Sequence, residues 1–216
     1  MNNCFTKRLN VLYGEIKGGG VFADVGCDHG YIAEEVIKNG LAEKVIISDI
    51  SEKCLDKAVK RLNEKYKNMF TAIVSDGFDK LPHVDEALIS GMGGEIIIKM
   101  LSLREDKPSR LILQPMKNPE MLREYIIDNG YKIIRDYTFK DRKYYHVIVA
   151  EKSDVKDFYT SDEIMFGRDN LTEKSEDFKM FIRDKITLFS DASSKAFSPE
   201  REELERKLDK FKEIIR

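Results

Sequence analysis

The chain has 216 residues, of which 42% are hydrophobic and 35% are charged, with a net charge of −2. This size suits one medium domain with a small addition. The near-neutral balance means that any nucleic-acid surface would have to be a local patch. Three cysteines without C-x-x-C spacing disfavour a disulfide framework, and three histidines disfavour a histidine-based metal cluster, so no metal is expected.

The apolar residues form neither a membrane-spanning segment nor the core of a signal peptide. No run reaches the roughly 18 apolar residues that span a bilayer. The first eight residues, MNNCFTKR, lack an apolar signal core. Together with the cysteine usage, this predicts a cytoplasmic protein without a membrane segment.

Short apolar runs alternate with amphipathic segments as far as residue 130, which predicts a series of parallel strands and helices. Gly40 is a suitable C-cap for the first of these helices, Ser51 an N-cap for the second, and Pro119 a first-turn residue for the last. The predicted strands are 21–25, 45–49, 71–75, 87–90 and 110–114, and the predicted helices are 31–39, 52–65, 95–103 and 120–128.

Two further strand-like runs, 131–139 and 144–151, are separated only by a short polar turn. The turn leaves no room for a crossover helix, so these runs should form an antiparallel hairpin. Five parallel βα units followed by an antiparallel pair are the layout of the α/β class I S-adenosylmethionine (SAM) methyltransferase fold. We therefore expect a Rossmann-like, seven-stranded sheet.

A polar stretch after residue 151 separates this sheet from an all-helical tail, which predicts domains at 1–152 and 153–216. Two amphipathic helices, the second starting at Ser198, are joined by a linker and suggest a helical hairpin or short coiled coil. Their apolar stripes consist of Phe178, Phe181, Ile182, Ile186 and Phe189, and of Leu204, Leu208, Phe211 and Ile215.

The turn after the first strand carries glycines but differs from a dinucleotide site. Gly26 and Gly30 give G-x-x-x-G, without the middle glycine that lets the backbone approach a pyrophosphate. Asp24 and Asp28 flank Gly26, and these carboxylates would repel a phosphate. A cationic cofactor without phosphate, such as SAM, is favoured instead. The alternative is a structural turn with solvated acids.

Two further acids follow the next two strands. Asp49 lies 23 residues after Gly26 (49 − 26), close to the offset of about 20 residues for an acid that binds ribose hydroxyls. Asp76 could accept a hydrogen bond from an adenine amino group, with Gly77 leaving room for the ring. Asp76 could equally be a turn or N-cap residue.

The loop after the fourth strand, 91–94, reads Gly-Met-Gly-Gly. Many amino-group methyltransferases carry N-P-P-Y here, where side chains hold the amine. In this chain only backbone could approach a substrate, and no strong general base is evident. That favours a ring nitrogen with a free lone pair, such as adenine N1, which needs alignment rather than deprotonation. The alternative is a helix start that requires small residues. Gln114 should lie on the acceptor rim.

Taken together, the motifs resemble the bacterial tRNA (adenine(22)-N1)-methyltransferases over about residues 5–151, with a helical tail of the same type. They are Lys7-Arg-Leu9, Ala23-Asp-Val-Gly-Cys-Asp-His-Gly-Tyr31, Ser75-Asp-Gly77, Gly91-Met-Gly-Gly94, Leu113-Gln-Pro-Met116 and Asn129-Gly-Tyr131. The resemblance implies methyl transfer from SAM to N1 of an adenine in the tRNA D-loop region, with 91–94 lining the target-base pocket.

Three sets of site residues follow from the motifs and the resemblance. The expected cofactor residues are Asp24, Gly26, Cys27, Asp28, His29, Gly30, Asp49, Ile50, Asp76 and Gly77. The expected catalytic residues are Gly91, Met92, Gly93, Gly94 and Gln114. The expected contacts to tRNA are Lys7, Arg8, Tyr31, Lys117, Arg123, Arg142 and Tyr145.

Several alternatives stay open at this point. The acceptor could be another RNA site, a small molecule or a protein, because one fold serves many acceptors. A binding protein that has lost catalysis is a further possibility. His29 and Tyr31 could contact a ligand or only shape the turn. The tail could grip tRNA, form a dimer contact or brace the domain, so the sequence decides neither its role nor whether the protein is a monomer or a weak dimer.

Overall fold

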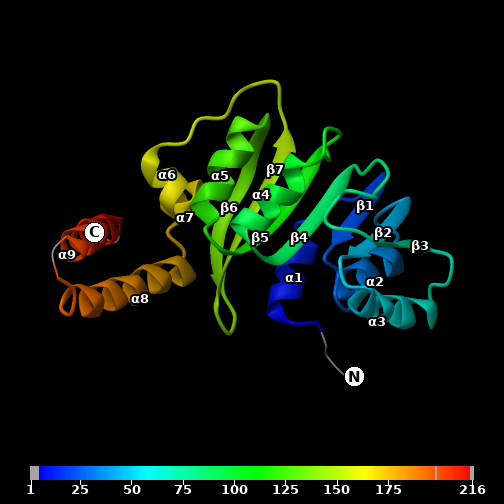
Figure 1. Ribbon diagram of the computed structural model, residues 1–216, viewed down its shortest axis with the longest axis horizontal. Helices are drawn as coiled ribbons and strands as arrows, with labels where there is room; N and C mark the ends of the chain where they lie inside the picture. The colour runs from blue at the N-terminus through cyan, green and yellow to red at the C-terminus, as the bar shows by residue number, and fades with distance from the viewer. Residues whose placement is uncertain (1–4, 198, 215–216) are drawn as a thin grey trace.

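The computed structural model describes residues 5–197 and 199–214 (Figure 1). Three residues used in the sequence-based predictions, Cys4, Ser198 and Ile215, lie outside this part of the chain. Among the described residues, no helix combines the length and the apolar character that crossing a membrane requires. Nor do the described residues contain a group of three or more His, Cys, Asp or Glu placed to hold a metal ion.

A seven-stranded sheet in the order β3-β2-β1-β4-β5-β7-β6 forms the centre of the molecule (Figure 1). β1 to β5 pair in parallel, and β7 runs antiparallel to both of its neighbours, β5 and β6. The predicted α/β sheet with its terminal hairpin is confirmed. The strands are β1 (Val21–Val25), β2 (Lys44–Asp49), β3 (Phe70–Val74), β4 (Glu86–Gly93), β5 (Arg110–Lys117), β6 (Tyr131–Lys140) and β7 (Tyr144–Lys152).

Helices cover both faces of the sheet because the central strands are apolar on both sides. On one face, α1 (Lys7–Gly14), α2 (Tyr31–Lys38) and α3 (Glu52–Asn63) pack over a core that includes Phe22 and Leu88. On the other face, α4 (Gly94–Ser102) and α5 (Pro119–Asp128) pack over a core that includes Val25 and Ile89. Successive strand residues point to opposite faces, which assigns each to one of the two cores.

Two strands extend beyond their predicted ends. β4 and β5 were expected to stop at Ser90 and Gln114, yet they stay paired as far as Gly93 and Lys117. Shifts in register after Ser90 accommodate the glycines within the ladder. A run of glycines does not predict a strand, so the continuation of β4 follows from its pairing with β5. Residues 91–94, which are predicted to meet the methyl acceptor and which we call the acceptor loop, are therefore held by a neighbouring strand.

The tail begins with two short helices that the sequence did not reveal, α6 (Ser161–Phe166) and α7 (Arg168–Glu173). α6 starts at a capping box in which Thr160 and Glu163 exchange hydrogen bonds. α8 (Glu176–Ser193) and α9 (Glu200–Ile214) follow and pack against each other at one end of the molecule, which confirms the predicted helical hairpin (Figure 1). Their apolar stripes meet around Phe166, Phe178 and Phe211.

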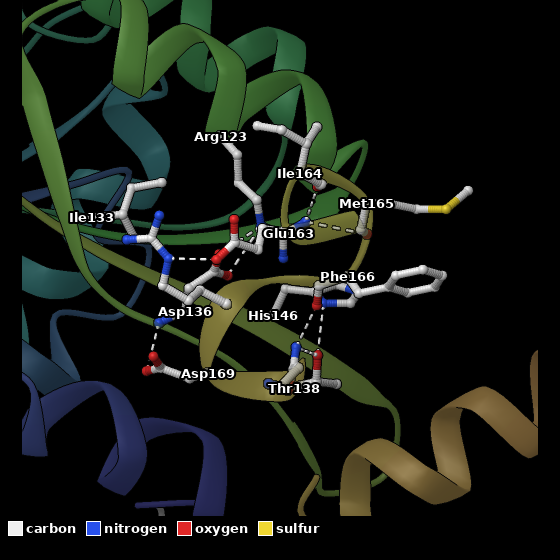
Figure 2. A network of polar contacts seen from close by, with 12 residues as sticks. Arg123, Ile133, Asp136, Thr138, His146, Glu163, Ile164, Met165, Phe166 and Asp169 are labelled. Carbon is white, nitrogen blue, oxygen red and sulfur yellow. Dashed lines mark hydrogen bonds and ion pairs between the residues drawn. The ribbon is translucent and has the colours of Figure 1, made fainter. Parts of the chain in front are cut away.

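Arg123 was predicted to contact RNA, and this prediction is wrong. Its side chain is fully buried and donates from Nε to both carboxylate oxygens of Asp136, at 3.0 and 2.9 Å (Figure 2). Its Nη1 donates to the carbonyl oxygens of Ile164 at 2.9 Å and Met165 at 3.4 Å. Arg123 is one of the buried residues of α5, and it attaches α6 to the sheet domain instead of facing solvent.

The connection between α6 and α7 depends on the same carboxylate. Gly167 has a φ of +89°, and a Cβ added there would lie 2.7 Å from Oδ1 of Asp136. The backbone N–H of Asp136 in turn donates to Asp169 of α7 at 3.0 Å. A side chain at position 167 would therefore displace the buried ion pair, which explains why the chain turns at a glycine here.

We predict that Arg123→Ala destabilises the protein by about 3–5 kcal/mol, because it leaves the Asp136 carboxylate buried without its charge partner. The control is Arg135→Ala. The side chain of Arg135 is about half exposed in its ion pair with Asp169, so the pair should contribute less than about 1 kcal/mol to stability. Urea denaturation of both variants measures the difference. Equal losses of unfolding free energy would contradict the role given to Arg123.

Candidate active site

The turn between β1 and α2 is held in a conformation that favours glycine. Gly26 has a φ of +75° and Gly30 a φ of +67°. The N–H groups of Gly26 and Cys27 donate to the carbonyl oxygen of Ser48 in β2, at 2.8 and 3.0 Å. A Cβ on Gly30 would lie 2.9 Å from Cβ of Ala58, so α2 and α3 approach closely at this point. The predicted cofactor turn is therefore held by hydrogen bonds to β2 and by close packing against α3.

Asp49 ends β2 beside this turn. Its Oδ1 accepts from the N–H of Ser51 at 2.9 Å, and its Oδ2 accepts from the N–H of Asp28 at 3.4 Å. Each carboxylate oxygen has a second lone pair, so both can still accept hydrogen bonds from ligand hydroxyls. The backbone thus orients Asp49 in a manner that fits the ribose of a nucleoside cofactor.

The other acid of the turn, Asp24, is buried below it. Burial raises the pKa of Asp24 from 3.8 to about 7, although the backbone N–H of Ala33 and the positive charge of Arg8 lower it. Burial likewise raises the pKa of the Cys27 thiol far above its ordinary value, and the charges of Asp24 and Asp49 add to this effect. Cys27 is therefore a neutral packing residue at pH 7, and Asp24 carries only part of a charge.

His29 and Tyr31 pack against local side chains. His29 approaches Asp28 to 3.7 Å, and its ring centroid lies 5.7 Å from that of Tyr31. The guanidinium of Arg61 in α3 lies 4.1 Å from the Tyr31 ring. Both residues are half-buried and shape the start of α2.

The remaining predicted cofactor residues lie at the carboxyl ends of β2 and β3. Ile50 is 66% exposed, which leaves an apolar surface next to Asp49. Asp76 is half-buried and lies 3.5 Å from the ammonium of Lys99. A Cβ on Gly77 would lie 2.7 Å from Cγ of Met100, so the glycine permits close packing of α4.

The acceptor loop meets the cofactor turn directly. A Cβ on Gly26 would lie 2.1 Å from Cε of Met92, so Met92 occupies the space that the missing side chain leaves. Gly91 has a φ of +82°, and a Cβ there would lie 3.2 Å from Nη2 of Arg8. Gly94 lies against the carbonyl oxygen of Asn118, which a Cβ would approach to 2.4 Å. The backbone of Asn118 requires glycine at position 94, and the positive φ values of Gly26 and Gly91 favour glycine there. The two predicted parts of the site thus lie next to each other.

Arg8 is brought into this site from α1, next to Gln114 and Tyr145. Its Nε donates to Oε1 of Gln114 at 2.9 Å and its Nη2 to the hydroxyl oxygen of Ser90 at 3.0 Å. The guanidinium lies 5.6 Å from the centroid of the Tyr145 ring. Arg8 therefore lies beside Gln114 and the end of β4, whereas the sequence suggested an external phosphate contact.

The other predicted RNA contacts are distributed along the carboxyl edge of the sheet. Lys117 and Arg142 are exposed, at the end of β5 and in the turn between β6 and β7. Lys7 donates to the carbonyl oxygen of Lys140 at 2.6 Å and lies 3.4 Å from Asp177, so it joins α1 to the tail. The remaining two have other partners, since Tyr31 contacts Arg61 and Arg123 pairs with Asp136.

Two side chains near the acceptor loop, Ser90 and Glu95, were not predicted from the sequence. Ser90 could have been noticed as a polar residue at the end of an apolar strand. The Glu95 carboxylate accepts from Asn118 and would lie 3.1 Å from a Cβ on Gly93. No sequence signal marks Glu95, because it follows the motif and pairs with a residue 23 positions away.

The sheet order, with an acid-lined glycine turn at the carboxyl ends of β1 and β2, defines a Rossmann-like class I methyltransferase fold. Residues 22–216 match the model of the tRNA (adenine(22)-N(1))-methyltransferase family. The chain belongs to this family.

Individual relatives agree with that assignment. The chain is 31% identical over 156 residues to the Bacillus subtilis tRNA (adenine(22)-N(1))-methyltransferase, covering 69% of this chain and 66% of that one. It is 33% identical over 134 residues to a Mycoplasma genitalium protein provisionally described as a tRNA methyltransferase, covering 60% and 61%. The aligned segments thus span less than two thirds of the length of these relatives.

A solved structure covers nearly the whole chain. It is a Streptococcus pneumoniae protein provisionally described as a tRNA (m1A22) methyltransferase, in complex with S-adenosyl-L-methionine. It matches with a TM-score of 0.89 at 25% identity and covers 98% of this chain and 99% of that one. The similarity therefore includes the tail.

Replacing Asp24 should show how burial acts on this acid. Because its folded-state pKa is raised, the neutral carboxyl is the favoured form, and its contribution to stability is lost as the pH rises from 3.8 towards 7. We predict that Asp24→Asn is nearly neutral at pH 4 and stabilises by up to about 4 kcal/mol at pH 8. Urea denaturation at both pH values measures this, and a pH-independent difference would contradict it.

Proposed function

We propose that this protein transfers the methyl group of SAM to N1 of adenine 22 in tRNA, and that it does so in the cytoplasm. The observation that carries the proposal is the contact between Met92 and Gly26, because it joins a cofactor turn to an acceptor loop made of backbone. Membership in the family and the names of its relatives support the same acceptor.

The residues present fit SAM. Asp49 is proposed to accept the ribose hydroxyls and Asp76 the adenine amino group, with Ile50 against the adenine ring. The turn that contains Asp24, Gly26, Cys27, Asp28, His29 and Gly30 would surround the methionine part. When bound, SAM supplies an electrophilic methyl group on a sulfonium.

Catalysis is proposed to rest on alignment at the loop 91–94. The adenine N1 lone pair forms the new N–C bond while the bond from carbon to sulfur breaks, and the N1-methylated base is left as a cation that later loses a proton to solvent. No base is needed before transfer. Gly91, Met92, Gly93 and Gly94 would position the ring, and the side chain of Gln114, fixed by Arg8, would close the wall and exclude water.

The tRNA is proposed to approach the carboxyl edge of the sheet. Lys117 and Arg142 are exposed there and suit phosphate contacts, whereas Arg8 and Tyr145 belong to the wall of the base pocket. We further propose that residues 1–152 form the catalytic domain and that 153–216 form a helical extension braced by Arg123.

The experiment that tests this function is methylation of a tRNA transcript that carries adenine 22, with tritiated-methyl SAM and mapping of the label by nuclease digestion and mass spectrometry. We expect label at N1 of adenine 22, and none on a matched transcript with guanine at that position. Label on a different adenine would refute the acceptor site but keep the class, and no label on RNA would refute the proposal.

We predict that Asp49→Ala weakens SAM binding by about tenfold or more, because hydrogen bonds to a charged acceptor are lost. The matched control is Asp56→Ala, since Asp56 is an exposed acid on α3 away from the turn and its loss changes the net charge equally. Titration calorimetry with SAM compares the two variants. Unchanged affinity in Asp49→Ala would disprove the ribose contact.

A further inference from the structure

A groove separates the sheet domain from the tail. It has a volume of about 630 Å³ and lies between α5 and the segment before it on one side and α6, α8 and α9 on the other. Lys117 and His146 contribute from the sheet, and Phe181, Lys185 and Phe189 contribute from α8. We call this the interdomain groove. Of the residues that line it, the proposed methyl transfer uses only Lys117.

The tail wall of the groove combines a cation with aromatic rings. The ammonium of Lys185 lies 5.5 Å from the ring centroid of Phe181 and 5.9 Å from that of Phe189. Within residues 5–197 and 199–214, no carboxylate pairs with Lys185. The other lysines of this wall are already paired, Lys207 with Glu203 and Lys210 with Asp162. Lys185 is thus available to an anionic ligand.

The floor of the groove carries a hydrogen-bond donor. Asn170 accepts from the N–H of Thr138 at 2.8 Å, which orients its amide so that Nδ2 donates to Oγ1 of Thr138 at 2.9 Å. The hydroxyl proton of Thr138 is then free to point to Nδ1 of His146, at 3.0 Å (Figure 2). With that proton donated to Nδ1, His146 carries its own proton on Nε2.

The charge state of His146 agrees with this arrangement. Burial lowers the pKa of His146 to about 3, and the positive charges of Arg123 and Lys185 lower it further. The imidazole is neutral at physiological pH, so Nε2–H is a fixed donor. Acceptors on a nucleobase, such as a carbonyl oxygen or a ring nitrogen, suit such a group.

The groove continues from the acceptor loop. Lys117 is the register partner of Gly93 across β4 and β5, and Met116 and Lys117 both line the groove. Lys117 is exposed and has no acid partner in the described part of the chain. The wall on α5 bears two exposed acids, Glu120 and Glu124, so a phosphate would be held away from α5, at Lys185 and Lys117.

We propose that the interdomain groove binds an unstacked nucleotide of the tRNA strand next to the target adenine. On binding, the ammonium of Lys185 moves from the rings of Phe181 and Phe189 to a phosphate, and the base takes its place on these rings. Lys117 contacts a second phosphate, and Nε2–H of His146 donates to an acceptor on the base. Cations beside aromatic rings are the usual means of holding single-stranded nucleic acid. This inference rests on the proposed tRNA methylation and assigns the tail a part in substrate binding.

The test compares Lys185→Ala, Lys185→Arg and the control Lys195→Ala, which removes an exposed lysine beyond the end of α8 and outside the groove. We expect Lys185→Ala to raise KM for tRNA about fivefold and to reduce the salt dependence of binding by about one phosphate contact. kcat at saturating tRNA and the affinity for SAM should stay unchanged, and Lys185→Arg should restore KM. A KM equal to that of Lys195→Ala would overturn the proposal.

Two further measurements do not depend on that variant. His146→Phe keeps a ring but removes the donor, so it should raise KM about threefold without changing the salt dependence, since no charge is lost. In wild-type protein, ultraviolet crosslinking to the tRNA should label the peptide that contains Phe181 and Phe189. A wild-type enzyme that methylates tRNA without this crosslink would refute the groove, whereas absence of methylation would refute the proposed function.

Discussion

The close approach of two glycine turns is the constraint on which the site depends. Met92 reaches into the space above Gly26, where a Cβ would lie 2.1 Å from its terminal methyl group. This contact is possible only because β4 continues through Gly91 and Gly93 while paired with β5. The sheet therefore holds the turn at Gly26 next to the segment 91–94, and the alignment that we propose for methyl transfer needs such a fixed arrangement.

Two arginines expected at the surface instead point inward and join separate parts of the molecule. Arg8 attaches α1 to β4 and β5 through Ser90 and Gln114, which makes the N-terminal helix part of the acceptor wall. Arg123 attaches the tail to α5 and β6 through Asp136 and the end of α6. The guanidinium suits this role because one planar group can donate to several acceptors at once.

The strand order, the hairpin and the cofactor turn were predictable, because periodicity and glycine spacing are local signals. The direction of Arg123 was not, since it stands between Leu122 and Glu124 in the sequence and is buried only because α6 covers it. α6 and α7 escaped notice because each has only six residues and their stability comes from packing. The position of Arg8 beside Gly91 likewise depends on contacts between residues far apart in the chain.

The most direct test of the account is a double-mutant cycle between Gly26→Ala and Met92→Ala, read as kcat/KM for methyl transfer to tRNA. Gly26→Ala should reduce it strongly, and adding Met92→Ala should restore part of the loss. The restoration should be incomplete, because alanine at a φ of +75° still costs about 1–2 kcal/mol. Full activity in Gly26→Ala, or losses that simply add in the double variant, would contradict the shared site.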